Sequence, residues 1–309
     1  MRTDSPALAL LALLPLALTA CTQKADTAQA PPRPPFEYIG DWSAKGDGPG
    51  QLSRPVAIAA DVHGLVYIAD AGSHFVHKFS TKGEPLLSFQ DAALRSPTAI
   101  ALDSGGAIYV ADSAWNAVHI FAPNGERIRS LRGGPGRKFK YPFGVAVDVE
   151  GSIYVAEFEV HRIQKLSPRG RFLAAWGRGG SVPEAFGTLS AIALGEDGVL
   201  YVADQDPLRI LKFVAAPEPV GTIETTSVVS GTVGRLIALA VGREHLFALD
   251  AGCSCLRTWT LDGRPGPILG LSSFLAVPGE KPIGLAAARG EEILVLTSSP
   301  RVLRFRLNF

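Results

Sequence analysis

Residues 142–157 read PFGVAVDVEGSIYVAE and hold two short apolar runs with a turn between them. The first run ends at the acidic residue Asp148, and the second, Ile-Tyr-Val-Ala-Glu at 153–157, ends at Glu157. Short runs rich in β-branched and aromatic residues and bounded by turn residues are typical of β-strands. The stretch therefore predicts two strands joined by a tight turn.

The second of these runs recurs along the chain. Five copies end in an acidic residue, at Asp70, Asp112, Glu157, Asp204 and Asp250, and a sixth, 294–297, has Thr297 in its place. The copies follow one another at steps of 42, 45, 47, 46 and 47 residues. Such a period, with about four short strands in each copy, is typical of a β-propeller blade. A solenoid would instead stack its repeats in a line and need distinct terminal caps.

The first run recurs with a stricter pattern, in which two small residues flank an aliphatic one. The small residues are Ala57 and Ala59, Ala99 and Ala101, Gly144 and Ala146, Ala191 and Ala193, Ala238 and Ala240, and Gly284 and Ala286. The aliphatic residues between them are Ile58, Ile100, Val145, Ile192, Leu239 and Leu285. Because a strand alternates its faces, one face is small and the other aliphatic. This pattern predicts the innermost strand of a blade, beside the central axis, where backbones crowd.

Composition agrees with this interpretation. The 309 residues include 33 Gly and 23 Pro, which suits many short strands joined by tight turns better than long helices. With 47% hydrophobic residues the chain has enough apolar side chains for a full core. Because 30 basic residues face 29 acidic ones, there is no overall electrostatic drive toward nucleic acid.

The copies resemble the NHL repeat family, whose repeat reads roughly P-x-G-[IV]-A-[VL]-D, then [IL]-Y-V-[AT]-D, then N-x-R-I-x-x-F. The best copies are 142–157 and the segment that runs from Asp112 through Asn116 and Val118 to Phe121. Copies four to six depart most: Leu208 and Ser254 stand in place of the Asn, and the sixth copy lacks the acid. The resemblance covers residues 36–309 and implies an all-β fold, a six-bladed β-propeller of four-stranded blades. It implies no particular activity, because this fold hosts unrelated functions.

The two ends of the repeat region predict how the ring closes. The last copy reaches Phe309 after its third strand, whereas residues 36–43 (FEYIGDWS) look like an unpaired fourth strand. We expect 36–43 to complete the last blade, so that no blade edge is exposed at the junction.

The N-terminus predicts export. Ala7–Ala20 is an uncharged apolar run of signal-peptide length, too short to span a bilayer. It ends Leu18-Thr19-Ala20-Cys21, which resembles the bacterial lipobox, so residues 1–20 are expected to be a lipoprotein signal peptide and Cys21 the lipidated residue. The alternative is ordinary secretion with cleavage near Ala20. Residues 21–35 are polar and then Pro-rich, typical of a tether. Thr22 is not the Asp that retains enteric lipoproteins in the inner membrane, which favours the outer membrane of a bacterial cell envelope.

The repeated acidic residues predict structure rather than chemistry. Each would end a second strand and accept backbone N–H groups of the following turn. His74 and His161 share one repeat position, and His77 and His119 share another. Equivalent positions on neighbouring blades lie a blade width apart, too far for a shared metal with ~2 Å bonds. We therefore expect no metal site, no cofactor and no catalytic residues.

Some enzymes resemble this fold, namely peptidyl-hydroxyglycine amidating lyases and regucalcin-type lactonases. The lyases place His where the inner strands begin, but the residues here are Arg54, Ser96, Tyr141, Thr188, Leu189, Arg235 and Lys281. The lactonases begin with a metal-binding Glu beside Gly-Pro, which residues 36–60 lack. An exported enzyme of this kind, with a metal-dependent site at the axial channel, is the alternative to a binding or scaffold protein.

Two groups of basic residues are candidate binding sites. Arg54, Arg235 and Lys281, with Tyr141 nearby, are expected around the axial opening. Internal pairing with Asp70, Asp250 and their neighbours is favoured there, and binding of a small anion or an acidic side chain of a partner is the alternative. The second group lies between Glu126 and Arg178, where eleven basic residues face five acidic ones, an excess of 11 − 5 = +6. Its members include Arg129, Arg132, Lys138 and Lys140. The expected partner is an envelope protein or an anionic polymer or lipid, with the membrane reached through the lipid anchor and no nucleic acid involved.

Cys253 and Cys255 form a C-x-C pair in the turn after Asp250. Disulfides persist in exported proteins, so these two cysteines are a candidate disulfide pair. A local staple, two separate thiols, and a redox or metal role are the alternatives.

Overall fold

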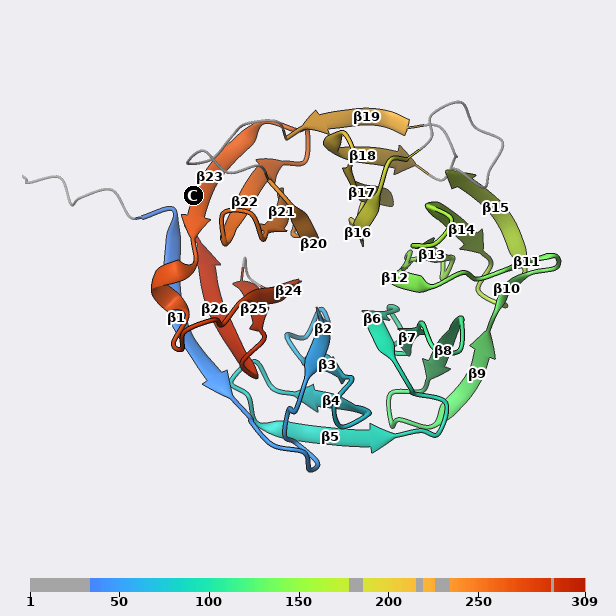
Figure 1. The fold of residues 1–309 in the computed structure, drawn as a ribbon, viewed down its shortest axis with the longest axis horizontal. Coiled ribbons are helices and arrows are strands. Elements are labelled where there is room, and N and C mark those ends of the chain that lie inside the picture. The colour runs from blue at the N-terminus through green and yellow to red at the C-terminus, as the bar shows by residue number, and fades with distance from the viewer. Residues whose placement is uncertain (1–33, 178–185, 215–218, 226–233, 290–291, 309) are drawn as a thin grey trace, which may run out of the picture. The chain divides into compact units, whose positions relative to one another are not determined.

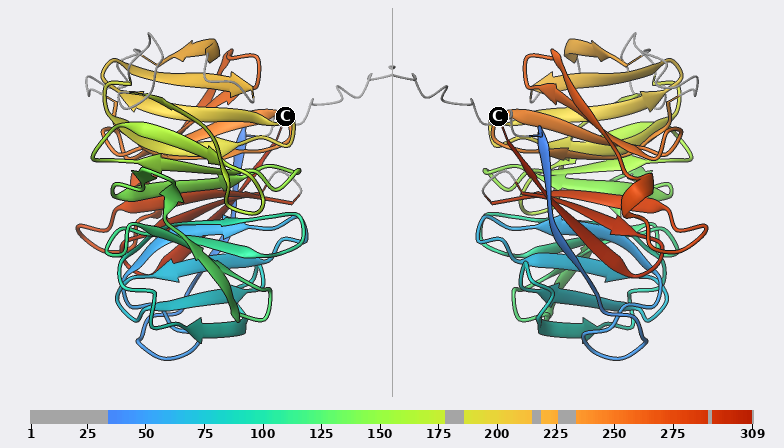
Figure 2. Two further views of the ribbon diagram at one scale, coloured as in Figure 1. Left: turned by 90° about the vertical axis from the view of Figure 1, so that its right-hand side faces the viewer. Right: turned by 90° about the vertical axis from the view of Figure 1, so that its left-hand side faces the viewer.

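The computed structural model describes residues 34–177, 186–214, 219–225, 234–289 and 292–308. Within them, six four-stranded antiparallel sheets are arranged as the blades of a ring (Figure 1). Seen from the side, the strands run between two opposite faces of the ring, where the turns gather (Figure 2). The predicted all-β, six-bladed propeller is confirmed.

Every blade is built from consecutive strands except the last. Blades one to three contain β2 (Pro55–Ala60), β3 (Val66–Asp70), β4 (Phe75–Phe79) and β5 (Pro85–Gln90); β6 (Pro97–Leu102), β7 (Ile108–Asp112), β8 (Ala117–Phe121) and β9 (Arg127–Leu131); and β12 (Pro142–Val147), β13 (Ile153–Glu157), β14 (Arg162–Leu166) and β15 (Phe172–Gly177). Blades four and five contain β16 (Leu189–Leu194), β17 (Val199–Gln205), β18 (Leu208–Val214) and β19 (Pro219–Glu224); and β20 (Leu236–Val241), β21 (His245–Asp250), β22 (Cys255–Thr260) and β23 (Pro265–Gly270). Blade six has the order β1 (Phe36–Ser43), β26 (Arg301–Leu307), β25 (Glu292–Thr297) and β24 (Pro282–Ala288).

The ring closes as the sequence predicts. β1 is the outer strand of blade six and pairs antiparallel with β26 from Phe36↔Leu307 to Ser43↔Arg301. The compact unit begins at Pro34, and Asn308 donates its backbone N–H to the carbonyl of Pro35 at 2.9 Å. The expected signal peptide, Cys21 and nearly all of the expected tether lie outside the described residues.

The small-and-aliphatic pattern of the inner strands results from contacts between neighbouring blades. A Cβ atom added at Gly144 would lie 3.0 Å from Cγ1 of Ile192 on the next blade, and one added at Gly284 would lie 3.1 Å from Cγ2 of Ile58. The small face of each inner strand therefore receives the aliphatic residue of the next blade. Six apolar clusters, each shared by two adjacent blades, make up the core of the described residues.

Two further elements lie outside the blades. A small hairpin of β10 (Gly133–Gly134) and β11 (Arg137–Lys138) projects from the connection between blades two and three (Figure 1). A 3-10 turn, η1 (Ser272–Phe274), is the one helical element among the described residues, and none of their helices is long enough to cross a membrane.

Candidate functional site

The inner strands all begin at one face of the ring, which we call the entry face, and end at the other, the exit face. The turns between second and third strands also lie at the entry face, because Pro55 pairs with Asp70 and each other blade repeats this register. The entry face thus carries the repeated acids, the predicted mouth residues and the C-x-C pair.

The repeated acids are buried, and four of the five accept N–H groups of the turn that follows them, as predicted; Glu157 instead binds the side chains of Arg162 and Gln164 in β14. The Asp70 carboxylate accepts N–H groups from Gly72 and Ser73 in its own turn, at 2.7 and 3.1 Å. It also accepts those of Ser53 and Arg54 at the start of the inner strand, at 2.6 and 3.0 Å. These bonds fasten the crossover between blades to the second strand.

The sixth blade obtains its acid from elsewhere. Thr297, at the acid position of β25, donates its hydroxyl to the carboxylate of Glu280, which lies in the preceding loop. Burial raises the pKa of Glu280, but the bonds from Thr297 and the Ala276 N–H, together with Arg301, outweigh it and leave this pKa below its ordinary value. Blade six therefore also has a buried, charged carboxylate at the end of its second strand, although Glu280 supplies it from the preceding loop and the strand itself ends in Thr297.

The histidines have structural positions. His74 and His161 share a left-handed turn position with Asn116 and Ser254, with φ between 45° and 59°. Copy four departs here, because β17 and β18 are joined through Asp206 and Pro207, with a cis peptide bond between them. His77 and His119 lie buried in third strands, each with Nδ1 bonded to a serine hydroxyl, at 2.9 and 2.7 Å.

The axial channel offers no acid–base chemistry among the described residues. Each inner strand has a bulge after its first residue, and the six bulge residues line the entry-face mouth: Val56, Thr98, Phe143, Ser190, Ile237 and Ile283. The rest of the channel is lined by aliphatic, alanine and glycine residues. None of these side chains ionises at neutral pH.

The larger cavities, of about 570 and 390 Å³, lie at the exit face between turns. Their aspartates are occupied by their own turns: Asp61 accepts the N–H groups of His63 and Leu65, both at 2.9 Å, and the Tyr67 hydroxyl at 3.2 Å. Asp103 and Asp148 repeat this arrangement. Burial, followed by the charge of Asp61, raises the pKa of Tyr67 to about 12, so its hydroxyl remains a donor.

The mouth cations lie at the entry face, but their side chains do not pair with the repeated acids. The guanidinium of Arg54 donates to the carbonyl of Ala71 at 3.2 Å, and no ion pair of Arg54, Arg235 or Lys281 is present among the described residues. Asp70 and Asp250 bind the backbone N–H groups of Arg54 and Arg235 instead.

Arginines in third strands provide the side-chain partners of the repeated acids. The pairs are Arg162 with Glu157, Arg209 with Asp204 and Arg257 with Asp250, at 2.8, 3.4 and 3.3 Å. Among the described residues the mouth cations therefore form no ion pairs with Asp70 and Asp250, although Arg54 does bind the carbonyl of Ala71, the neighbour of Asp70.

Tyr141 connects the mouth to a neighbouring exposed surface. It is 43% exposed and has φ +51°, a left-handed conformation that is costly for an aromatic residue. Its N–H donates to Oδ1 of Asn116 on blade two at 2.7 Å. Its ring lies 5.9 Å from that of Phe158, which is 47% exposed.

Trp115 extends this surface onto blade two. It is 41% exposed, and the guanidiniums of Arg95 and Arg132 lie 5.9 and 5.8 Å from its ring. Arg132 also donates to the Trp115 carbonyl at 2.9 Å. With the exposed Lys140 these residues form what we call the aromatic–cationic surface: Arg95, Trp115, Arg132, Lys140, Tyr141 and Phe158.

Ion pairs neutralise part of the predicted basic cluster. Arg127 pairs with Asp91 at 3.0 Å, Arg162 with Glu157 at 2.8 Å, and Lys165 with Asp148 at 4.0 Å. Arg178 lies outside the described residues. The cluster members without an ion pair among the described residues are Arg129, Arg132, Arg137, Lys138, Lys140, Arg169 and Arg171. Arg137 and Lys138 belong to the β10–β11 hairpin.

The sequence alone did not identify Arg95, Trp115 or Phe158 as candidate binding residues. The signal was present in the repeat itself, because Trp115 and Phe158 stand at turn positions that Ser73 and Ala71 occupy in blade one. A large aromatic residue at a turn position that is small in another copy is not required by the turn itself and is a candidate for an exposed side chain.

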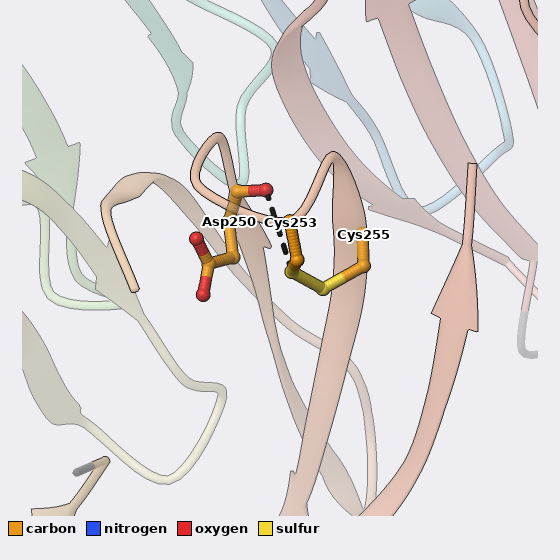
Figure 3. A group of neighbouring side chains, drawn as sticks. All are labelled: Asp250, Cys253 and Cys255. Atoms are coloured by element: carbon orange, nitrogen blue, oxygen red, sulfur yellow. Dashed lines mark hydrogen bonds between the residues drawn. A yellow bond between two sulfur atoms is a disulfide. The ribbon is translucent and has the colours of Figure 1, made fainter. Parts of the chain in front are cut away.

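At the entry face, Asp250, Cys253 and Cys255 form the one group of three potential metal-binding side chains in the described part of the chain (Figure 3). Their ligand atoms lie within 4.8 Å of one another. The two cysteines are joined by a disulfide, so in this form neither sulfur is a thiolate.

Comparisons with known proteins agree with the fold. Residues 139–166 match the NHL repeat, and none of the curated proteins matches the chain in sequence. A solved streptogramin B lyase is 12% identical, with a TM-score of 0.63 over 88% of this chain and 98% of that one. A virginiamycin B lyase from Staphylococcus aureus is 14% identical, with a TM-score of 0.64 over 88% and 100%, and its catalytically inactive variant with quinupristin gives the same values. At such identities these likenesses show the propeller fold alone.

Proposed function

We propose that this chain is a lipid-anchored binding propeller of the bacterial cell envelope, held through Cys21. Its entry face binds an acidic segment of another envelope protein on the aromatic–cationic surface. The blades form the rigid scaffold, and the turns of blades two and three supply the contacts.

The observation that carries this proposal is the exposure of Trp115, Tyr141 and Phe158 beside cations without acidic partners. Exposed aromatic residues and arginine are the side chains that dominate binding energy at protein interfaces. The nearest repeated acids, Asp112 and Glu157, are 0% exposed and bound to backbone or side-chain donors. Arg95, Arg132 and Lys140 outnumber Glu159, the exposed acid beside Phe158, so the surface has a net positive charge and an acidic partner complements it.

The position of the chain's entry favours a protein over a lipid surface. β1 belongs to blade six, which lies across the ring from blade three and from the β10–β11 hairpin (Figure 1). β1 begins at the exit face, because Phe36 pairs with Leu307 at the exit-face end of β26, so the described chain starts on the face opposite the aromatic–cationic surface. Docking of the aromatic–cationic surface on anionic lipid is the competing outcome.

The alternative, an exported lyase or lactonase-like enzyme, has the shared fold in its favour. The channel residues do not support it, because they bring no ionisable side chain to the axis in the described part of the chain. We therefore favour the binding function.

The experiment uses a soluble form in which an ordinary cleavable export signal replaces residues 1–21. Titration with polyglutamate should show binding at low salt that weakens as salt is added, since screening reduces exposed charge interactions. The triple variant Arg95→Gln, Arg132→Gln, Lys140→Gln should bind about tenfold more weakly. The matched variant Lys82→Gln, Arg243→Gln, Arg289→Gln, on the exit face, should bind like the wild type.

Equal binding by both triple variants, or no binding of polyglutamate by the wild type, would contradict the proposal. Binding of phosphatidylglycerol vesicles without binding of polyglutamate would assign the surface to the membrane instead.

A further inference from the structure

The C-x-C pair occupies the turn of blade five at the entry face, apart from the aromatic–cationic surface. Cys253 lies in the turn between β21 and β22 and is partly exposed, whereas Cys255 is 2% exposed and pairs with Asp250 in the β-ladder. The Cys253 sulfur lies 3.8 Å from the carbonyl oxygen of Asp250, as drawn in Figure 3.

The other blades show that this turn forms without a bridge. Blades one to three have the same left-handed residue, at His74, Asn116 and His161, where blade five has Ser254 between its two cysteines. Blades one and two also have the buried acid that binds the turn, whereas Glu157 in blade three binds Arg162 at the start of β14. Positions 253 and 255 are taken by Ser73 and Phe75 in blade one, so the conformation needs no disulfide.

A bridge at this place also holds little together. A disulfide stabilises mainly by closing a loop of the unfolded chain, and the effect falls as the loop shortens. The sequence separation is 2, and the strand pairing of Asp250 with Cys255 already fixes one end. A structural staple therefore explains the pair poorly.

We propose that Cys253 and Cys255 form a thiol–disulfide exchange site that oxidises thiols of proteins or small molecules in the oxidising compartment to which the proposed export delivers the chain. A substrate thiolate attacks Sγ of Cys253, a bond forms between the two sulfurs, and the Cys253–Cys255 bond breaks with Cys255 leaving as a thiolate. A second substrate thiolate then attacks the substrate sulfur and releases Cys253. The substrate loses two electrons as its disulfide forms, and the chain gains them as two thiols, which a disulfide of another molecule reoxidises.

The exposure of the two sulfurs sets the direction of attack. Cys253 is partly exposed and Cys255 is buried at the start of β22, so the incoming thiolate attacks Cys253, and Cys255 can re-form the bond. The nearby Asp250 carboxylate is compensated by Arg257 at 3.3 Å and by the N–H groups of Arg235 and Gly252 at 2.8 and 2.9 Å. The leaving thiolate therefore does not meet an uncompensated negative charge.

The test uses the same soluble form, which has lost Cys21 and so contains two cysteines. Reduced glutathione should open the bond in the folded protein at a rate proportional to its concentration. With glutathione disulfide, Cys255→Ser should form a mixed disulfide about tenfold faster than Cys253→Ser, because only accessible thiols react readily. The double variant Cys253→Ser, Cys255→Ser should melt within about 3 °C of the oxidised wild type.

Three results would overturn the assignment. Reduction at a rate independent of glutathione would mean that the bond opens only on unfolding. Equal rates of mixed-disulfide formation in Cys255→Ser and Cys253→Ser would show that Cys253 is not the preferred site of attack. A fall in Tm of more than about 8 °C in the double variant would mark the bridge as structural. None of these results bears on polyglutamate binding, so this inference and the proposed function fail separately.

Discussion

His77 and His119 occupy the same position in the third strands of blades one and two. In each, Nδ1 is bonded to a serine and the buried Nε2 has no hydrogen-bond partner in the structure. Burial lowers the pKa of His77 to about 4 against the opposing charge of Asp70, and burial likewise lowers the pKa of His119. Both rings are therefore neutral in the folded protein at neutral pH.

These histidines make stability depend on pH. A folded pKa below the unfolded value means that the unfolded chain binds more protons, so the contribution is present above pH 6.5 and lost as pH falls toward 4. Blade three has Gln164 at this position, so His77→Gln with His119→Gln should fold. Between pH 7 and 4.5 the free energy of unfolding of the wild type should fall by ~2 kcal/mol more than that of the variant in urea titrations. Parallel pH profiles would contradict the burial argument.

Some residue roles could be predicted because the same residue type recurs in most copies, and others could not. The buried role of Asp70 and its equivalents could be predicted because five copies carry an acid at one position. The pairing of Asp250 with Arg257, rather than with Arg235, could not be predicted, because it depends on which side chain turns inward. The role of Glu280 in blade six could not be predicted either, because blades one to three have Ser53, Arg95 and Lys140 at this position and none of these is acidic.

At the scale of elements, the strands were predictable and one connection was not. The inner strands follow from small residues that receive the next blade, as at Gly144 and Ile192. The β10–β11 hairpin lies in a crossover that repeats nowhere else, so no comparison between copies could reveal it. It carries Arg137 and Lys138 outward beside the aromatic–cationic surface.

Ring closure by β1 predicts unequal effects of two deletions. Removing 36–43 takes away the buried Phe36 and leaves the edge of β26 unpaired. Losing such contacts costs several kcal/mol, so Tm should fall by about 10 °C or more. Deleting 22–31 should leave Tm unchanged. Equal melting temperatures in calorimetry would show that β1 does not hold the ring closed.

At the scale of the whole molecule, the fold and the binding surface have different origins. The fold follows from what the six copies share. The aromatic–cationic surface follows from what blades two and three do not share with the others, namely Trp115, Tyr141 and Phe158. The residues that the copies share therefore predict the propeller but not the binding surface. That surface combines residues that differ between copies, and it can be recognised only when the structure shows which turns of blades two and three are neighbours.

The central claim is that an acidic envelope protein docks on this surface, and cross-linking in living cells tests it most directly. A photoreactive amino acid would replace Ala114 or Glu159, exposed neighbours of Trp115 and Phe158, in the full-length chain. The exit-face positions Val62 and Arg243 serve as controls. We expect one common adduct from 114 and 159, joined through an acidic segment and diminished by Arg95→Gln with Arg132→Gln. No adduct at the entry face, or the same adduct from 62 and 243, would contradict this claim.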